Sequence, residues 1–304
     1  SFQVLEMLKK FIHPISDTPD TVIVEQIDYY SSQFWTLIPY SCGRNRPPLI
    51  DSDKDVEKYS ELLDTLKNIQ IATRILANGH CLVQLYNFLG ISLDPVNENT
   101  KDFSVISQYI TNTHAITHNY KLELLEIFSL EKAFQDENDS EKLFENVEDH
   151  RLLIHGTNMS NFMGIFSEGL RVPTVSQVSN GSVLGRGIYF ADSISKSFNY
   201  CNSHTTDNIG FIILCEVALG ANPHEVTQAT YDQPGEEYTS RIACGRSTPE
   251  STVTMHIGKN NKVKVSNGKL IEKVGFKSDF LYNEYVIYQP ELYRFRYLLK
   301  IKSD

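Results

Sequence analysis

The chain has 304 residues, of which 41% are hydrophobic and 22% are charged. This length corresponds to about two domains of ~100 to 200 residues each, and the apolar content is sufficient for packed cores, which excludes a wholly disordered chain. Acidic residues outnumber lysine and arginine by 38 to 28, so the net charge of −10 has the wrong sign for a protein that binds nucleic-acid phosphates by itself.

Other broad features narrow the class further. No apolar run approaches the ~20 residues of a membrane span, so we expect a soluble protein without a membrane partner. The five cysteines form no C-x-x-C pair, which fits a reducing compartment better than a disulfide framework. The chain starts with serine and no signal-peptide pattern follows, so we expect it to be cut from a longer protein.

The first third of the sequence has helical character. Apolar residues recur at spacings of three and four from Val56 to Leu76, after candidate N-caps at 51–53, which predicts one long amphipathic helix. Glu61 and Asp64 begin a polar stripe on its other side. A solvated helix face is the ordinary interpretation of such a stripe.

Beyond about residue 79 the sequence changes to short apolar runs separated by glycine, asparagine and proline. This pattern is typical of strands joined by loops, and with a few helical segments it predicts an α+β domain with a mostly antiparallel sheet. The acidic stretch 136–141 is interpreted as a solvated loop. The candidate strands are 152–154, 187–191, 211–217, 253–257, 263–265, 282–288 and 293–301, and the candidate helices are 105–113 and 159–169.

Glu284 lies in an otherwise apolar stretch. Period-two alternation places its carboxylate on one face with Tyr282, Val286 and Tyr288. Burying an unpaired carboxylate is costly, so either this face lines a cleft or the strand lies at a sheet edge. Alternation alone leaves these two interpretations even.

Further residues fit both a structural and a functional interpretation. His155 and Gly156 follow an apolar run, where a turn with a capping histidine explains them unless a ligand approaches the glycine backbone. Tyr189 and Tyr200 serve equally as core aromatics or as walls of a slot for a flat cationic ring.

Metal and acyl-transfer chemistry have little support. His114 and His118 are four residues apart, which suits metal ligation on a helix, but no third ligand is evident nearby and the segment resembles a helix end. We therefore predict no metal site. No G-x-S-x-G motif is present and no cysteine lies in a nucleophile motif.

Three separated stretches carry a specific pattern when they are combined. They are 152–157 (LLIHGT), 184–201 (LGRGIYFADSISKSFNYC) and 281–285 (LYNEY), supported by 112–115 (NTHA), 216–220 (EVALG) and 297–300 (YLLK). Together they closely resemble the catalytic signature of the poly(ADP-ribose) polymerases, and His155, Tyr189 and Glu284 match that family's H-Y-E triad.

The resemblance extends to the N-terminal part. Segments 34–39 (FWTLIP) and 47–50 (PPLI) resemble the helical regulatory domain of the DNA-damage-dependent members. The resemblance implies an α-helical regulatory domain over residues 1–78, beginning later than in relatives, followed by a mostly antiparallel ADP-ribosyltransferase domain over 79–304. In that subgroup the helical domain blocks the NAD site until DNA breaks loosen it, which gives Glu61 and Asp64 a regulatory role.

The resemblance also implies a set of NAD-binding residues. Gly156 would hold the nicotinamide carboxamide through its backbone with help from Ser197, and Tyr200 would stack on the ring opposite Tyr189. His155 would bind the adenosine ribose. The full set implied is His155, Gly156, Thr157, Arg171, Tyr189, Phe190, Ala191, Ser197 and Tyr200.

The implied catalytic residues are Glu284, His155, Tyr189 and Lys196. Cleavage of the nicotinamide–ribose bond develops oxocarbenium character. A carboxylate bonded to the ribose 2′-hydroxyl stabilises that charge and orients the acceptor, which is the physical reason for an acid at Glu284. No metal is needed, because nicotinamide is already a cationic leaving group.

We therefore predict an NAD-dependent ADP-ribosyltransferase that modifies protein side chains, its own included, and extends the product to poly(ADP-ribose). A mono-ADP-ribosyltransferase and a non-catalytic NAD-binding scaffold in DNA damage are the alternatives. The subgroup resemblance implies a nuclear protein that responds to DNA breaks through domains absent from this chain. It also implies an accessory factor for serine modification, although residues 302–304 lack the aromatic tail that relatives use to dock it.

Overall fold

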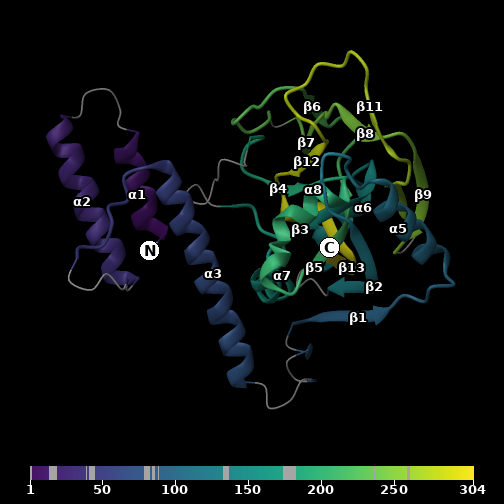
Figure 1. Ribbon diagram of the computed structural model, residues 1–304, viewed down its shortest axis with the longest axis horizontal. Helices are drawn as coiled ribbons and strands as arrows, with labels where there is room; N and C mark the ends of the chain where they lie inside the picture. Colours follow the sequence, from purple (N-terminus) through teal and green to yellow (C-terminus); the bar gives the residue numbers. More distant parts are fainter. Residues whose placement is uncertain are drawn as a thin grey trace. The chain divides into compact units, whose positions relative to one another are not determined.

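The computed structural model describes residues 2–13, 19–38, 40, 45–78, 83, 86, 87, 89–132, 137–173, 183–235, 237–258 and 261–304. The chain forms two compact units, one holding residues up to Ile71 and the other comprising Ala72–Val172 and Val183–Asp304. The helices α1 to α3 come first along the chain, and mostly antiparallel strands with further helices among them follow, so the predicted α+β class is confirmed (Figure 1). The domain boundary expected after residue 78 stays a prediction.

The first unit is helical. It contains α1 (Phe2–Ile12), α2 (Asp20–Leu37) and α3 (Asp53–Asn78) as far as Ile71, and α3 confirms the long helix predicted from apolar spacing. Ser52 begins α3, because its hydroxyl accepts the backbone N–H of Asp55 at 3.2 Å and donates to the Asp55 carboxylate at 2.5 Å. The core of this unit consists of Leu5, Leu8, Phe34, Trp35, Ile50, Val56, Tyr59 and Leu63.

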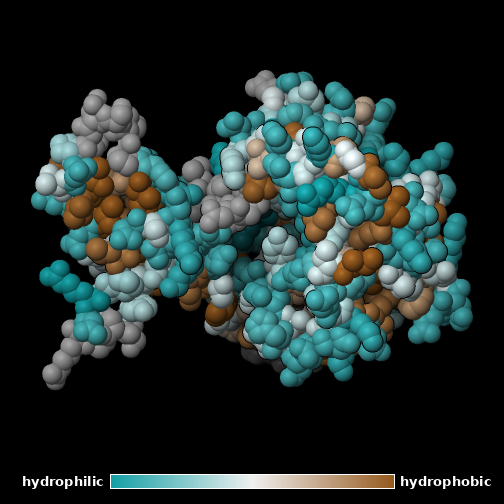
Figure 2. All heavy atoms as spheres, turned by 45° about the horizontal axis from the view of Figure 1, so that its top comes forward, coloured by the Kyte–Doolittle hydropathy of each residue, from teal (hydrophilic) through white to brown (hydrophobic). Residues whose placement is uncertain are grey.

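Burial in the helical unit is incomplete. On α2, the side chains of Val24 and Tyr29 are 64% and 54% exposed. Figure 2 shows apolar atoms gathered on one face of this unit; the visible surface of the second unit is mixed, with apolar patches among hydrophilic atoms. None of the helices among the described residues is long and apolar enough to cross a membrane.

The second unit is built on a seven-stranded sheet with the order β1-β2-β13-β5-β3-β10-β9, accompanied by a four-stranded sheet β4-β12-β7-β6 and the pair β11-β8. Most neighbours are antiparallel; β10 with β3 and β6 with β7 are parallel. The strands are β1 (Ile91–Pro95), β2 (Leu122–Lys132), β3 (His150–Gly156), β4 (Ile188–Phe190), β5 (Ile209–Ala218), β6 (His224–Val226), β7 (Ser240–Ala243), β8 (Ser247–Pro249), β9 (Thr252–Ile257), β10 (Asn261–Ser266), β11 (Leu270–Glu272), β12 (Glu284–Ile287) and β13 (Tyr293–Ser303).

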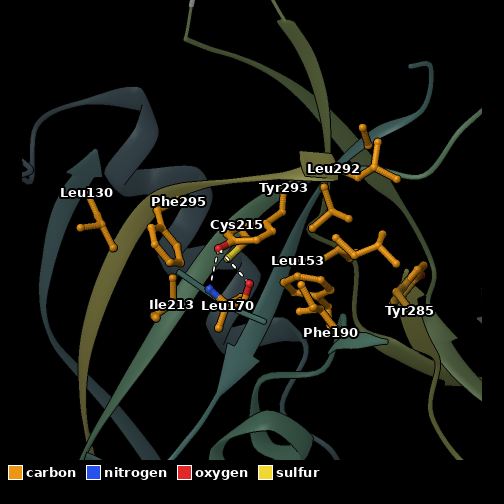
Figure 3. Packing of buried hydrophobic residues seen from close by; sticks show 14 of the residues in the cluster. Leu130, Leu153, Leu170, Phe190, Ile213, Cys215, Tyr285, Leu292, Tyr293 and Phe295 are labelled. Atoms are coloured by element: carbon orange, nitrogen blue, oxygen red, sulfur yellow. Dashed lines mark hydrogen bonds between the residues drawn. The ribbon is translucent and has the colours of Figure 1, made fainter. Parts of the chain in front are cut away.

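The central strands of the large sheet are buried on both faces. In β3, Leu152 and Ile154 pack in one hydrophobic cluster with α5 (Lys101–Asn112) and α8 (Ile194–Phe198), whereas Leu153 packs in the other. That second cluster, drawn in part in Figure 3, includes residues of α6 (Glu137–Asn146), α7 (Phe162–Glu168) and the small sheet. Burial on both faces explains why β3 and β5 are continuous apolar runs in the sequence.

Two expectations about helices have different outcomes. The helices predicted at 105–113 and 159–169 are confirmed as α5 and as the 3₁₀ turn η1 (Met159–Asn161) followed by α7. The loop predicted at 136–141 is wrong, because α6 begins at Glu137. Residue 136 lies outside the described residues. The other short 3₁₀ turns are η3 (Asn199–Cys201), η4 (Ser203–Thr205) and η5 (Pro290–Leu292).

A buried charge cluster connects three strands of the large sheet. Glu216 of β5 is fully buried; its carboxylate accepts from Arg296 Nε at 2.7 Å and Nη2 at 2.6 Å, and from His150 Nδ1 at 2.6 Å. Burial alone would raise the pKa of Glu216, but the His150 and Arg296 partners lower it. Burial by itself would lower the pKa of His150. The Glu216 carboxylate outweighs this effect, so the pKa of His150 is raised.

Candidate active site

The end of β3 brings two predicted site residues next to the small sheet. Ile154 and Ala191 exchange backbone hydrogen bonds of 2.8 and 2.9 Å, which joins β3 to the residue after β4. The next residue, His155, lies beside β4 and its Nδ1 is 3.0 Å from the carbonyl oxygen of Tyr189. A carbonyl only accepts, so Nδ1 carries the proton and Nε2 is left as an acceptor. Burial lowers the pKa of His155.

Gly156 lies against α8 so closely that no side chain fits. A Cβ built on this residue would lie 1.9 Å from the backbone oxygen of Ser197. The Ser197 hydroxyl donates to the carbonyl of Ile154 at 3.3 Å, and its side chain is buried. The sequence interpretation of His155 and Gly156 as a simple turn is therefore incomplete, because Gly156 is required for helix–strand contact.

The Tyr189 ring is fixed by its hydroxyl. The hydroxyl donates to the carbonyl of Gly185 at 2.7 Å and accepts the backbone N–H of Leu184 at 3.0 Å. Burial raises the pKa of Tyr189. The neighbouring Phe190 side chain packs in the core, and Ala191 is buried with its backbone N–H and carbonyl bonded to Ile154, so neither side chain is presented to a ligand.

Glu284 is paired with Lys196. Its Oε1 lies 2.7 Å from Lys196 Nζ, and both side chains are about one fifth exposed, at 19% and 18%. Strand β12 lies between β4 and β7, which excludes the edge-strand interpretation of Glu284. Burial lowers the pKa of Lys196, against the opposing effect of the Glu284 carboxylate. The carboxylate thus faces a partly open space with a cation held beside it.

Behind this ion pair is a buried polar network that the sequence interpretation missed. The backbone carbonyl of Asn283 accepts a hydrogen bond from Lys196 Nζ at 3.1 Å. The side-chain amide of Asn283 donates to the Asp192 carboxylate at 2.7 Å and accepts from the Gly245 N–H at 2.8 Å. The Tyr285 hydroxyl also donates to Asp192, at 2.8 Å. In the sequence, Asp192 comes shortly after the apolar strand β4 and Asn283 comes directly before the apolar strand β12, and these polar positions were the available signal. The hydrogen bond between them could not be predicted, because only folding brings the two residues together.

The remaining predicted residues lie around this centre. Tyr200, in η3, is 62% exposed. The pKa of its hydroxyl is raised by partial desolvation and by the negative charge of Glu284. Thr157 accepts from Asn161 Nδ2 at 2.9 Å, and the guanidinium of Arg171 pairs with Glu168 at the end of α7. All of these residues belong to the second unit.

The predicted regulatory acids lie in the other unit. Glu61 and Asp64 are both on α3, and the pKa of Glu61 is raised by burial and by the neighbouring carboxylates of Glu57 and Asp64. Their proposed action on the site stays a prediction.

His114 and His118 follow the end of α5 at Asn112, as the sequence indicated. The His118 ring stacks on Tyr120 at 5.8 Å between centroids, and its Nε2 lies 3.3 Å from Asn199 Nδ2. Across the described parts of the chain, no group of three or more His, Cys, Asp or Glu side chains is arranged to hold a metal ion.

Comparison with known proteins identifies the family to which this site belongs. The family model described as "Poly(ADP-ribose) polymerase catalytic domain" matches residues 100–303, and the one described as "Poly(ADP-ribose) polymerase, regulatory domain" matches residues 1–82. The chain belongs to the poly(ADP-ribose) polymerase family. The resemblance inferred from the H-Y-E triad is thus confirmed, as is the combination of a helical regulatory domain with a catalytic domain.

Curated proteins similar to this chain are named poly [ADP-ribose] polymerase 1 or 2. Poly [ADP-ribose] polymerase 1 of Gallus gallus is 35% identical over 288 residues, covering 92% of this chain and 28% of that protein. Poly [ADP-ribose] polymerase 2 of Homo sapiens is 36% identical over 283 residues, covering 90% and 47%. The enzyme of the same name from Arabidopsis thaliana is 33% identical over 311 residues, covering 98% and 47%. The chain thus spans between about a quarter and a half of these relatives.

Proposed function

We propose that this chain is an NAD-dependent protein ADP-ribosyltransferase that builds poly(ADP-ribose) and releases nicotinamide. The observation that carries the proposal is the pairing of Glu284 with Lys196 beside the close contact of Gly156 with Ser197. NAD is the substrate used by the catalytic domain of this family. The residues present suit NAD. Aromatic rings are available for its cationic ring, the Gly156 backbone for its carboxamide, and the Glu284 carboxylate for its ribose.

The nicotinamide end is assigned to Gly156, Ser197, Tyr189 and Tyr200. The Gly156 backbone supplies one donor and one acceptor, the pair that a carboxamide requires. Tyr200 is exposed enough to stack on a bound ring, whereas Tyr189 is held by its hydroxyl and offers a fixed aromatic surface. A cationic ring gains roughly 0.5 to 2 kcal/mol from an aromatic face.

Gly156→Ala is expected to disrupt this end of the site. Its Cβ would collide with the Ser197 backbone at 1.9 Å, so α8 or β3 must move. Overpacking of this kind costs about 1 to 3 kcal/mol of folding free energy, measured by denaturant unfolding. We also expect benzamide, a nicotinamide mimic, to lose more than about tenfold in affinity, which is 1.4 kcal/mol.

Gly90→Ala is the matched control for Gly156→Ala. Gly90 has a φ of +63° and nothing within 4 Å of a built Cβ, so alanine there is strained without any collision. Its strain costs roughly 1 to 2 kcal/mol. Benzamide affinity should be unchanged in this control; an equal loss in both variants would remove Gly156 from the nicotinamide site.

The adenosine end is assigned to His155, Thr157 and Arg171. His155 is kept neutral by burial, and its Nε2 can accept a hydrogen bond from a ribose hydroxyl because Nδ1 is occupied by the Tyr189 carbonyl. Thr157 offers a hydroxyl near the start of the segment that leads through α7 to Arg171.

The proposed reaction breaks the bond between ribose C1′ and the nicotinamide nitrogen. The bonding electron pair leaves with nicotinamide, which becomes neutral, and an acceptor oxygen forms the new bond to C1′. Glu284 stabilises the positive charge that develops on the sugar and accepts or orients the proton that the acceptor loses. Lys196 holds the carboxylate in position through the 2.7 Å contact.

Nicotinamide release by the purified chain supplied with NAD tests the proposed function. Automodified protein should run as a long smear on a gel if polymer forms. A sharp band with nicotinamide release would instead indicate the mono-ADP-ribosyltransferase. Benzamide binding without any nicotinamide release would indicate a non-catalytic NAD-binding scaffold, against which the intact His155, Tyr189 and Glu284 argue.

We propose that the helical domain restrains this activity through Glu61 and Asp64. Removal of residues 1–78 is then expected to raise basal nicotinamide release several-fold, and the double variant Glu61→Gln/Asp64→Asn to raise it in the same direction. Circular dichroism must first establish that both proteins are folded. An unchanged rate in the folded deletion protein would contradict the restraining role.

The proposed partners follow from the same subgroup. Protein side chains, including those of this chain, are the acceptors, and DNA breaks act indirectly through domains outside this chain. We place the protein in the nucleus on the basis of its DNA-damage-dependent relatives. An accessory factor for serine modification remains a proposal.

A further inference from the structure

Two residues outside the H-Y-E triad and the NAD-binding set form hydrogen bonds with the main chain just before Arg171. The first is Tyr293, at the start of β13, which is almost fully buried. Its hydroxyl accepts the backbone N–H of Leu170 at 2.6 Å and points toward the carbonyl of the same residue at 3.5 Å (Figure 3). Tyr293 therefore bonds the residue directly before Arg171.

Gly169 adapts the backbone to this phenol. It has a φ of +83°, and a Cβ built on it would lie 2.7 Å from the Tyr293 hydroxyl oxygen. The hydroxyl can thus reach the Leu170 amide only because residue 169 has no side chain. Leu170 is buried, so its N–H would lack a hydrogen-bond partner if the hydroxyl were removed.

The second residue is Lys132, at the end of β2. Its ammonium donates to the carbonyl oxygens of Phe166 and Ser167, with Nζ 2.9 Å from the latter, and these are carbonyls of the last turn of α7. A cation at this position satisfies helix carbonyls that have no partner within the helix. The end of α7 and the residue that follows Gly169 are therefore fixed by side chains from two different strands.

We propose that Tyr293 and Lys132 are positioning residues for the adenosine half of NAD, acting by holding the main chain that presents Arg171. This inference rests on the proposed function, because it deepens the role assigned there to Arg171. Tyr293 also packs near Phe190, at 6.3 Å between ring centroids, but its hydroxyl is directed at Leu170. The effect is thus confined to one end of the site.

The test is Tyr293→Phe, which removes the hydroxyl and keeps the ring in the core. We expect KM for NAD and the dissociation constant of ADP-ribose to rise about fivefold, the fold-change corresponding to one net hydrogen bond, with kcat within about twofold. Benzamide affinity should not change, because benzamide occupies only the nicotinamide end. Lys132→Met should shift the same two quantities in the same direction.

Tyr297→Phe is the matched control. Tyr297 is a buried tyrosine on the same strand, but its hydroxyl donates to Asp102 at 2.9 Å, away from α7. It should leave all four quantities unchanged. In an Arg171→Ala background, Tyr293→Phe should add no further loss of ADP-ribose affinity, because the residue through which it acts is gone.

Several results would overturn the inference. They are an unchanged ADP-ribose affinity in folded Tyr293→Phe, an equal loss of benzamide affinity, a full additional loss in the Arg171→Ala background, and a wild-type chain that does not bind ADP-ribose. Failure of the proposed function is distinguishable: the wild type would then release no nicotinamide, while ADP-ribose binding and the hydrogen exchange of the Leu170 amide would still report the positioning effect.

Discussion

Glu284→Gln is expected to lower nicotinamide release by about 10² to 10⁴-fold, the range typical of removing a positioned acid or base. Glutamine keeps the size of the side chain but cannot stabilise positive charge on the ribose or take up a proton. It also leaves the Lys196 ammonium without its carboxylate partner beside a cationic substrate. The measurement is nicotinamide release from NAD, together with the gel pattern of automodified protein.

Glu291→Gln provides the control for this variant. Glu291 is an exposed glutamate in η5, close along the chain to β12. The carboxylate that Lys196 contacts is that of Glu284. It should retain wild-type release. Benzamide should bind Glu284→Gln with near wild-type affinity, since the carboxylate serves the sugar. Equal polymer from Glu284→Gln and the wild type would remove Glu284 from the mechanism.

Glu216→Gln is expected to cost the largest amount of folding free energy among single charge changes, about 3 to 5 kcal/mol. Arg296 and His150 share the Glu216 carboxylate, and their side chains are only 16% and 9% exposed. Without that carboxylate, their positive charges would be buried with no negative partner at this position. Urea unfolding of the wild type and the variant measures the loss.

The pH dependence gives this prediction a second signature. Because the folded protein lowers the pKa of Glu216, its contribution is present above the unfolded pKa and is lost as the pH falls through the folded pKa. The stability difference between wild type and variant should therefore shrink in acid.

The control, on β2 of the same sheet, is Glu126→Gln. Its carboxylate pairs with Lys300 of β13 at 3.2 Å, and the two side chains are 51% and 31% exposed. An exposed pair contributes about 0 to 1 kcal/mol. A similar loss at both positions would mean that burial does not distinguish the two ion pairs.

Much of the architecture could be predicted from local patterns. The apolar spacing from Val56 to Leu76 predicted α3, and continuous apolar runs predicted β3, β5 and β13. Strand β2 was missed, since its charged residues alternate irregularly and only Ile127 and Leu130 are buried. Helix α6 was mistaken for a loop because its start is acidic. Its buried Phe144 contacts His150 nearby and Arg294 of β13, and the second contact is distant in sequence.

The candidate site shows the same division. Alternation could mark Glu284 as unusual, but it could not decide between a cleft and a sheet edge, because that depends on which strands lie on either side of β12. The family resemblance supplied the proposed roles, which spacing left open. The Asp192–Asn283 hydrogen bond was not foreseen, as it joins residues 91 positions apart and leaves no periodic pattern.

The position of β13 has a consequence for how the protein is made. This strand comes last in the chain but lies inside the large sheet, paired with β2 on one side and β5 on the other. A nascent polypeptide therefore leaves both neighbours with open backbone edges until Tyr293–Ser303 has been synthesised, and such edges favour aggregation. We expect ribosome-bound intermediates that stop short of Tyr293 to depend on chaperones, because the two halves of the sheet join only when β13 pairs with β2 and β5.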